Sequence, residues 1–196
     1  MCSQDVAYNE KFGAYTGELS ASLLVDAGIK WTLTGHSERR VGFGGQGESS
    51  KQVAIKTKNA LNAGMSVMLC IGEMLSDRES GNTMNVCIEQ LTACTDILKP
   101  EEWKRIVIAY EPVWAIGTGK VATPQQAEET HYNIRQWISK NVSSSVASEI
   151  RIVYGGSVKG SNCNELIKCP NIDGFLVGGA SLLPEFVDII KCASGI

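Results

Sequence analysis

The sequence AYEPVWAIGTGK at residues 109–120 decides the fold of this chain. It continues a β-branched run, Arg105 to Tyr110, which has the composition of a fully buried strand. The run ends on a carboxylate, Glu111, and then breaks into a loop with a proline at its start and glycines at its tip. In α/β barrels, catalytic groups stand at the C-terminal ends of parallel strands, and the loops behind them can close as lids. We therefore predict an α/β enzyme with Glu111 at its reacting centre.

Strand and helix patterns alternate along the rest of the chain, which predicts βαβ units and a parallel sheet. Besides residues 105–110, strands are predicted at residues 31–35, 66–71, 151–154 and 174–177, with a remnant at residues 2–6. Helices are predicted at about residues 48–63 and 79–98. A third begins at Thr123, because threonine, proline and then Gln126 form a capping box. Right-handed crossovers would gather the loops that follow the strands at one face, where Glu111 lies.

Five segments carry motifs in a characteristic order. They are TGHSERR at residues 34–40, LCIGE at 69–73, AYEPVWAIGTGK at 109–120, VYGGSV at 153–158 and GFLVGGASL at 174–182. In order and spacing these motifs closely resemble the triosephosphate isomerase family, and the resemblance runs from residue 13 to residue 190. It implies a TIM (β/α)8 barrel and an enzyme that interconverts dihydroxyacetone phosphate and glyceraldehyde 3-phosphate. The implied reaction is a proton transfer through an enediolate, in glycolysis and gluconeogenesis.

The chain is shorter than this fold requires. A (β/α)8 barrel has about 250 residues, whereas this chain has 196, interpreted as a single, partial barrel domain over residues 1–196. The resemblance implies that the first two βα units are missing, together with a loop whose asparagine and lysine contact the substrate. We therefore expect a truncated product, a partial gene model or a splice form. We also expect little turnover from the isolated chain, because that lysine is absent and an unclosed barrel exposes sheet edges.

Composition argues against several classes of partner. The chain is 43% hydrophobic and 20% charged with a net charge of −3, as in an ordinary soluble globular protein. Acidic and basic residues are interspersed, so we predict no site for nucleic acid or an anionic membrane, and no apolar run is long enough to span a bilayer. The sequence has Cys 7 and His 2, and no two cysteines form a Cys-x-x-Cys pair. This composition does not predict a zinc site. We expect free thiols, a cytoplasmic location, no signal peptide, no metal and no cofactor.

Glu111 and His36 form the predicted reacting pair. By resemblance, Glu111 is the catalytic base, which removes a proton from the carbon beside the carbonyl and returns it to the neighbouring carbon. His36 polarises the carbonyl as a neutral imidazole, a pairing for which this family is a standard example. The residues after His36 start a helix, whose N-terminus favours the neutral ring. The alternatives are a surface glutamate at a strand end and a histidine satisfied in the core or at the surface.

Three further side chains near these motifs receive separate predictions. By resemblance, Glu38 is a third catalytic residue that helps in proton handling and pairs with the absent lysine; alternatively it only complements a helix dipole. Cys70 lies near the base in the family and is expected to be structural. His131 stands in a predicted helix among Glu128, Glu129 and Arg135. We expect this histidine to be solvated and to have no role.

Residues that resemble the family's phosphate-binding positions are Gly117, Ser157, Gly178 and Gly179. A phosphate dianion needs several N–H donors at close range, and glycine lets the backbone approach it. Barrels of this kind place phosphate after their last two strands, at the N-terminus of a short helix such as residues 178–181 could form. Isolated glycines otherwise indicate turns only.

The segment from Pro112 to Ala122 is expected to form a lid over the substrate. The proline fixes one hinge, and Gly117 and Gly119 free the tip. Closure would exclude water and so suppress elimination of phosphate from the enediolate. By resemblance, Tyr154 and Ser157 grip the closed lid. The lid residues are Pro112, Val113, Trp114, Ala115, Ile116, Gly117, Thr118, Gly119 and Lys120.

Residues 12–18 resemble the family's loop that inserts into a neighbouring subunit. Thr16 would there reach the active site of the partner. The resemblance is the only reason to expect a homodimer, since such a segment is by itself simply a loop. The expected partners are therefore a second copy of the chain and a small phosphorylated triose.

Two patterns resemble nucleotide sites without predicting one. GFGGQG at residues 42–47 lies some distance after its strand, and Gly44, Gly45 and Gln46 look like an insertion relative to the family, which leaves the local order around Arg39 and Arg40 open. GTGK at residues 117–120 lacks the first glycine and the Ser/Thr of a phosphate loop.

Two other readings of the whole chain stay open. The first is a non-catalytic remnant that only associates with full-length subunits. The second is a different phosphate-binding barrel, such as one from tryptophan synthesis. That barrel would explain Gly178 and Gly179 but not the lid behind Glu111.

Overall fold

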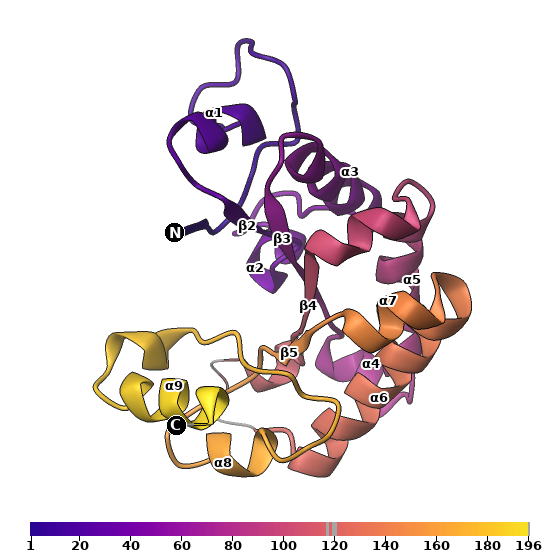
Figure 1. The fold of residues 1–196 in the computed structure, drawn as a ribbon, viewed down its shortest axis with the longest axis vertical. Helices are drawn as coiled ribbons and strands as arrows, with labels where there is room; N and C mark the ends of the chain where they lie inside the picture. Colours follow the sequence, from indigo (N-terminus) through magenta and orange to yellow (C-terminus); the bar gives the residue numbers. More distant parts are fainter. Residues whose placement is uncertain (117, 119–120, 196) are drawn as a thin grey trace. The chain divides into compact units, whose positions relative to one another are not determined.

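The computed structural model describes residues 1–116, 118 and 121–195 and divides into two compact units (Figure 1). Unit 1 comprises Met1–Ile71 and Glu89–Val107, and unit 2 comprises Gly72–Ile88 and Ile108–Ile196. The strands form a 5-stranded sheet in the order β1-β2-β3-β4-β5. Parallel strands that alternate with helices confirm the predicted α/β class and are consistent with a partial barrel.

Unit 1 is built on parallel strands. β1 (Cys2–Ser3) pairs with β2 (Trp31–Thr34), which pairs with β3 (Ser66–Ile71). Helix α3 (Ser50–Asn62) packs against β2 and β3, and Figure 1 shows it beside them. The other helical segments with residues in this unit are α1 (Ala21–Asp26), α2 (Ser37–Val41), the C-terminal part of α5 (Thr83–Thr95) and the 3₁₀ helix η1 (Pro100–Arg105). Apolar side chains of β3 such as Val67 and Leu69 are fully buried, which explains the β-branched composition of these strands.

Unit 2 is built around β4 (Ile106–Tyr110) and β5 (Ile152–Tyr154), which are parallel with Tyr110 opposite Tyr154. One parallel bridge then joins Tyr154 to Phe175. Helix α6 (Pro124–Asn141) packs against α7 (Ser144–Glu149) and β5. The remaining elements are α4 (Leu75–Glu79), the N-terminal part of α5, the 3₁₀ helix η2 (Val113–Ala115), α8 (Cys163–Leu166), the 3₁₀ helix η3 (Gly179–Leu182) and α9 (Phe186–Ser194).

Most predicted elements are confirmed with small changes of length. The strand at residues 66–71 and the capping box at Thr123 are confirmed, and Gln126 accepts a hydrogen bond from the Thr123 amide at 3.0 Å. The helix predicted at about 79–98 is present as the shorter α5, and Gly81, with a φ of +71°, separates it from α4, which was not predicted. The remnant at 2–6 forms strand only at Cys2–Ser3, and the strand at 174–177 is reduced to the Phe175 bridge. In the described residues no helix combines the length and apolar composition needed to cross a membrane.

The prediction that His131 is solvated is wrong. Its side chain is fully buried on α6, edge-on to the ring of Tyr110 with the ring centroids 5.6 Å apart. Nδ1 lies 3.1 Å from the carbonyl oxygen of Asn171. Burial lowers the pKa of His131 to about 4, so the ring is neutral at pH 7. The charged neighbours in the sequence had suggested an exposed face, but the packing of α6 turns His131 inward.

The free energy of unfolding should therefore decrease at acidic pH because of His131. A buried histidine that stays neutral when folded binds its proton only on unfolding, so its contribution is full above pH 6.5 and is lost as pH falls through about 4. We expect this residue to remove about 2 to 3 kcal/mol of unfolding free energy between pH 7 and pH 4.5. Urea unfolding at both pH values should show that loss in the wild type and in His36→Asn. The loss should be absent in His131→Asn; an equal loss there would contradict the assignment.

Candidate active site

Glu111 lies directly after β4 and is 2% exposed. Two glycines make room for it. A Cβ built on Gly72 would stand 1.7 Å from the Glu111 carbonyl oxygen, and one on Gly155 would stand 3.0 Å from Glu111 Cγ. Neither position can carry a side chain without moving the backbone or the carboxylate arm. The sequence thus lets backbone approach Glu111 on two sides, at its main chain beside Gly72 and at its side chain beside Gly155.

The loops after neighbouring strands bring the predicted base and phosphate residues of unit 2 to one edge. β4 and β5 are paired at their C-terminal ends, where the Gly155 amide donates to the Tyr110 carbonyl at 2.8 Å. The bridge at Phe175 extends this arrangement by one strand position. Glu111, Ser157 and Gly178 therefore each follow one of three adjacent parallel segments, the edge at which barrels hold their chemistry.

The predicted phosphate residues differ in their surroundings. Ser157 is half-buried, and its carbonyl accepts a hydrogen bond from Asn162 Nδ2 at 2.9 Å. Gly178 and Gly179 are exposed at the start of η3, and a Cβ on either would meet nothing within 4 Å. Open space beside exposed backbone suits a ligand that binds through N–H groups. The fourth predicted residue, Gly117, lies outside the described residues.

The lid begins at residues 112–116, called here the lid stem, which are held by contacts to the rest of unit 2. Pro112 leads into η2, whose Ala115 is fully buried, and the Val113 amide donates to the Glu73 carbonyl at 3.1 Å. Ile116 follows η2, and Thr118 Oγ1 donates to the Trp114 carbonyl at 2.7 Å. The predicted tip residues Gly119 and Lys120, like Gly117, are not among the described residues.

Tyr154, predicted to grip the lid, is buried at the end of β5. Burial raises the pKa of its phenol to about 12, while the backbone amide of Ala122 acts in the opposite direction. The phenol therefore stays protonated at neutral pH.

Sequence reasoning assigned no role to Glu73, which the structure places under the lid stem. Its side chain is fully buried. Oε1 accepts hydrogen bonds from Trp114 Nε1 at 2.9 Å, Tyr110 Oη at 3.1 Å and Thr83 Oγ1 at 3.4 Å. Burial raises the pKa of Glu73, and the hydrogen bonds from Trp114 and Tyr110 limit the rise. The one available signal was an acid directly after the apolar strand of the LCIGE motif.

Loss of the indole donor should therefore weaken the stem. Trp114→Phe keeps the ring but removes a hydrogen bond to a buried carboxyl group. Because Trp114 is half-buried, we expect a cost of about 1 to 2 kcal/mol in unfolding free energy. In a double-mutant cycle with Glu73→Gln, measured by urea unfolding, the two changes should not be additive. Trp137→Phe on α6 is the control, and its cost in unfolding free energy should add to that of Glu73→Gln. If the costs of Trp114→Phe and Glu73→Gln were also fully additive, the hydrogen bond between Trp114 and Glu73 would be refuted.

In unit 1, His36 caps the N-terminus of α2. The backbone amide of Glu38 donates to His36 Nδ1 at 3.3 Å. Nδ1 is then an acceptor, so the proton of the neutral ring sits on Nε2, which becomes a hydrogen-bond donor. Gly35, before it, takes a φ of +71°, and a Cβ there would stand 2.7 Å from Val53 and 3.0 Å from the Cys70 carbonyl oxygen. A glycine is required at this turn.

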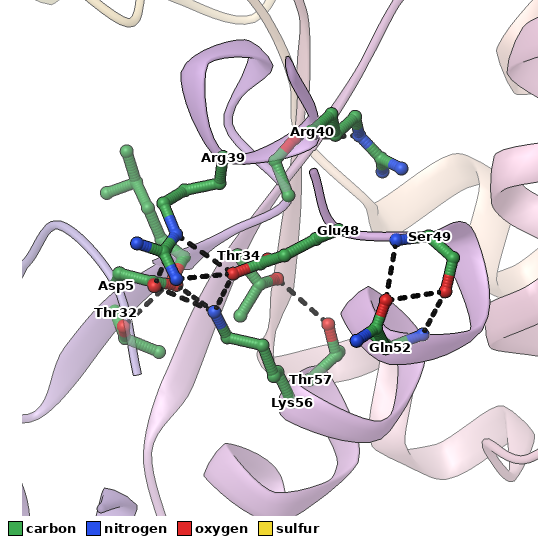
Figure 2. A network of polar contacts seen from close by, with 12 residues as sticks. Asp5, Thr32, Thr34, Arg39, Arg40, Glu48, Ser49, Gln52, Lys56 and Thr57 are labelled. Atoms are coloured by element: carbon green, nitrogen blue, oxygen red, sulfur yellow. Dashed lines mark hydrogen bonds and ion pairs between the residues drawn. The ribbon is translucent and has the colours of Figure 1, made fainter. Parts of the chain in front are cut away.

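A polar network holds in place the turn at Gly35 and His36, called here the histidine loop (Figure 2). Arg40 donates to the carbonyl oxygens of Gly35 at 2.8 Å and Cys70 at 3.0 Å. Arg39 pairs with Glu48 at 2.7 Å and with Asp5 at 3.0 Å. Both arginines are thus fixed despite the nearby insertion, which answers the question that the sequence left open.

The same network includes a buried cation. Lys56 is 2% exposed and lies 2.7 Å from Glu48 and 2.6 Å from Asp5, as Figure 2 shows. Two carboxylates offset the cost of burying the ammonium group. The pairs join α2, α3 and the segment after β1, which stabilises the base of the histidine loop.

The other predicted residues of unit 1 have plain surroundings. The Glu38 side chain is 67% exposed in the first turn of α2. Cys70 is fully buried in β3, as expected for a structural residue. Thr16 is exposed in the segment before α1. His36 and Glu38 belong to unit 1, whereas Glu111, the lid and the predicted phosphate residues belong to unit 2. Among the residues that the structure describes, no group of three or more His, Cys, Asp or Glu side chains gathers to hold a metal ion.

Comparison with known proteins gives consistent matches. The sequence profile described as triosephosphate isomerase matches residues 1–193. The chain is 57% identical over 185 residues to the triosephosphate isomerase of Coprinopsis cinerea, a match that covers 94% of this chain and 72% of the relative. It is 54% identical to the cytosolic triosephosphate isomerase of Oryza sativa (94% and 71% covered). It is 55% identical to the triosephosphate isomerase of Dictyostelium discoideum, a match that covers 98% of this chain and 74% of the relative.

Proposed function

The chain belongs to the triosephosphate isomerase family, and on this premise we propose that it interconverts dihydroxyacetone phosphate and glyceraldehyde 3-phosphate. The observation that carries the proposal is Glu111, a buried carboxylate at the C-terminal end of β4 with a lid segment directly behind it. One carboxylate in a dry pocket can take a proton from one carbon and return it to its neighbour.

The first chemical step is removal of a proton beside the carbonyl by Glu111. The electron pair of the broken C–H bond moves toward the carbonyl oxygen and produces an enediolate. The protonated Glu111 then returns the proton to the former carbonyl carbon, and a new carbonyl forms on the carbon that lost its proton in the first step. Glu111 is regenerated in each cycle. The hydroxyl proton must also move from the oxygen of the new carbonyl to the oxygen of the old one, and we propose that this transfer passes through His36.

His36 is proposed to stabilise the oxygen on which charge develops. Its Nδ1 accepts from the α2 backbone, which leaves Nε2–H as the donor toward the substrate oxygen. A neutral donor that is already oriented by a helix start needs no rearrangement during the reaction. We propose that Glu38 assists proton handling, although its exposure also suits a residue that only complements the helix dipole.

The phosphate group is proposed to bind at Gly117, Ser157, Gly178 and Gly179. The open backbone at Gly178 and Gly179 supports this assignment. The lid, from Pro112 to Ala122, would close over the phosphate and exclude water, which protects the enediolate from elimination. Tyr154, buried at the end of β5, would help to hold the closed lid.

We also propose a cytoplasmic homodimer in which Thr16 reaches the partner's site. The segment that carries Thr16 exposes apolar side chains, with Phe12 at 76% and Tyr15 at 45% exposed. Exposed apolar groups gathered on one loop favour burial against another chain. The named location of the Oryza sativa relative supports the cytoplasmic assignment.

The isomerisation of glyceraldehyde 3-phosphate tests the proposal. Two proteins are compared: the 196-residue chain, and a joined chain in which the two βα units that we expect to be missing, taken from the Coprinopsis cinerea relative, precede these residues. We expect steady turnover by the joined chain and little by the 196 residues alone. A folded joined chain without turnover would contradict the proposed function.

A further inference from the structure

Helix α4 carries a charged side chain, Arg78, beside the lid stem. Glu73 lies before this helix and Thr83 after it, and Thr83 Oγ1 donates to Glu73 Oε1 at 3.4 Å. This hydrogen bond closes the segment that contains α4 at its base. Gly81, with a φ of +71°, permits the chain to turn back toward Glu73. Arg78, in the last turn of α4, is therefore held close to the buried carboxyl group under the stem.

The guanidinium group of Arg78 lies over the face of the Trp114 ring. Its Cζ atom is 5.9 Å from the ring centroid, within the range of a cation–π interaction. The same indole donates from Nε1 to Glu73 Oε1 at 2.9 Å. The indole of the lid stem is thus held at its N–H by a buried carboxyl group and at its face by a cation. Both of these groups come from residues 73–83.

The charge of Arg78 strengthens both partners of the hydrogen bond between Trp114 and Glu73. Burial raises the pKa of Glu73, and the charge of Arg78 is among the effects that oppose this rise. Arg78 therefore favours the ionised carboxylate, which is the stronger acceptor. A cation over an aromatic face also draws electron density toward itself, which makes the indole N–H a stronger donor. A neutral side chain at residue 78 would supply neither effect.

We propose that Arg78 is a positioning residue of the lid, whose guanidinium group on the Trp114 ring holds the lid stem against Glu73. The stem follows Glu111 directly, so its position sets where the lid leaves the proposed base. When the stem of a lid is loosened, kcat and KM commonly change together. This consequence for the reaction rests on the proposed function, whereas the contact between Arg78 and Trp114 does not.

Exchange of the Trp114 indole proton with water tests the contact without reference to activity. The 196-residue chain is labelled with ¹⁵N, and its four indole N–H signals are followed by NMR. The signal that Trp114→Phe removes belongs to Trp114. We expect Arg78→Met to speed exchange of this proton about two- to fivefold, as for loss of one cation–π contact. Arg78→Lys keeps a cation and should retain most of the protection, and the other three signals should not change.

Arg151→Met is the matched control, since Arg151 is an exposed arginine directly before β5. It should leave all four indole signals unchanged. Circular dichroism checks that each variant is folded, and Arg78→Gln takes the place of Arg78→Met if the latter does not fold. Unchanged exchange of the Trp114 proton in the folded uncharged variant would overturn the proposal. Exchange in Arg78→Lys as fast as in Arg78→Met would overturn it too, because the cation would then have no effect.

The kinetics of the joined chain test the role in the reaction. Arg78→Met should lower kcat/KM about two- to fivefold through changes in both constants, and Arg78→Lys should recover most of the loss. Faster indole exchange with unchanged kinetics would overturn the positioning role. A joined chain without turnover would instead contradict the proposed function, and indole exchange would still decide whether Arg78 holds the stem.

Discussion

Glu111→Gln should lower the isomerisation rate of the joined chain by about 10²- to 10⁴-fold, the usual contribution of a positioned general base. Glutamine has nearly the shape of glutamate and remains polar, so it fits the space that Gly155 leaves for this side chain. It cannot accept a proton at the pH of the assay. We therefore expect the loss in kcat, with little change in KM.

Glu129→Gln is the matched control for this change, since Glu129 is an exposed carboxylate on α6. It should leave both kinetic constants unchanged. Retention of more than a tenth of the activity in Glu111→Gln would exclude Glu111 as the base. A large rise of KM with unchanged kcat would instead assign it to substrate binding.

His36→Asn should lower kcat by about 10²- to 10³-fold, the cost of removing one oriented donor from a developing oxyanion. Asparagine is chosen because it is a preferred N-cap residue. It can still accept from the Glu38 amide and so keep α2, but it lacks the imidazole Nε2–H. The change thus separates the capping role of His36 from its proposed chemistry.

Ser49→Ala provides the matching capping control. Ser49 Oγ accepts from the Gln52 amide at 3.3 Å at the start of α3, and its loss should cost about 1 kcal/mol of unfolding free energy without lowering kcat. If His36→Asn has near wild-type kcat, His36 acts as a helix cap and not as an electrophile. A shared loss of kcat in both variants would point to the fold of unit 1 instead.

Local sequence signals predicted the elements around the candidate base well. The β-branched run before Glu111 and the capping box at Thr123 depend on neighbours within a few residues, and both are confirmed. The strand expected at 174–177 shrank to a bridge, because its pairing depends on a partner segment more than on its own composition.

Long-range packing produced the features that the sequence did not predict. Glu73 is buried by Tyr110 and Trp114, which lie 37 and 41 residues away in sequence. His131 is turned inward by contacts that include Asn171, 40 residues away. The sequence neighbours of His131 carry no sign of its burial, and those of Glu73 carry only one, the apolar strand that precedes it. The candidate base could be found because a strand pattern and a loop pattern meet at Glu111.

Hydrogen exchange with solvent tests the central claim most directly. The joined chain is incubated with dihydroxyacetone phosphate in D₂O, and deuterium in the recovered substrate and in glyceraldehyde 3-phosphate is measured by NMR. Proton transfer through Glu111 predicts deuterium on the carbon beside the carbonyl, at a rate that falls with turnover in Glu111→Gln. Isomerisation without any deuterium in either triose phosphate would indicate a hydride shift, and would contradict a mechanism in which Glu111 carries the proton.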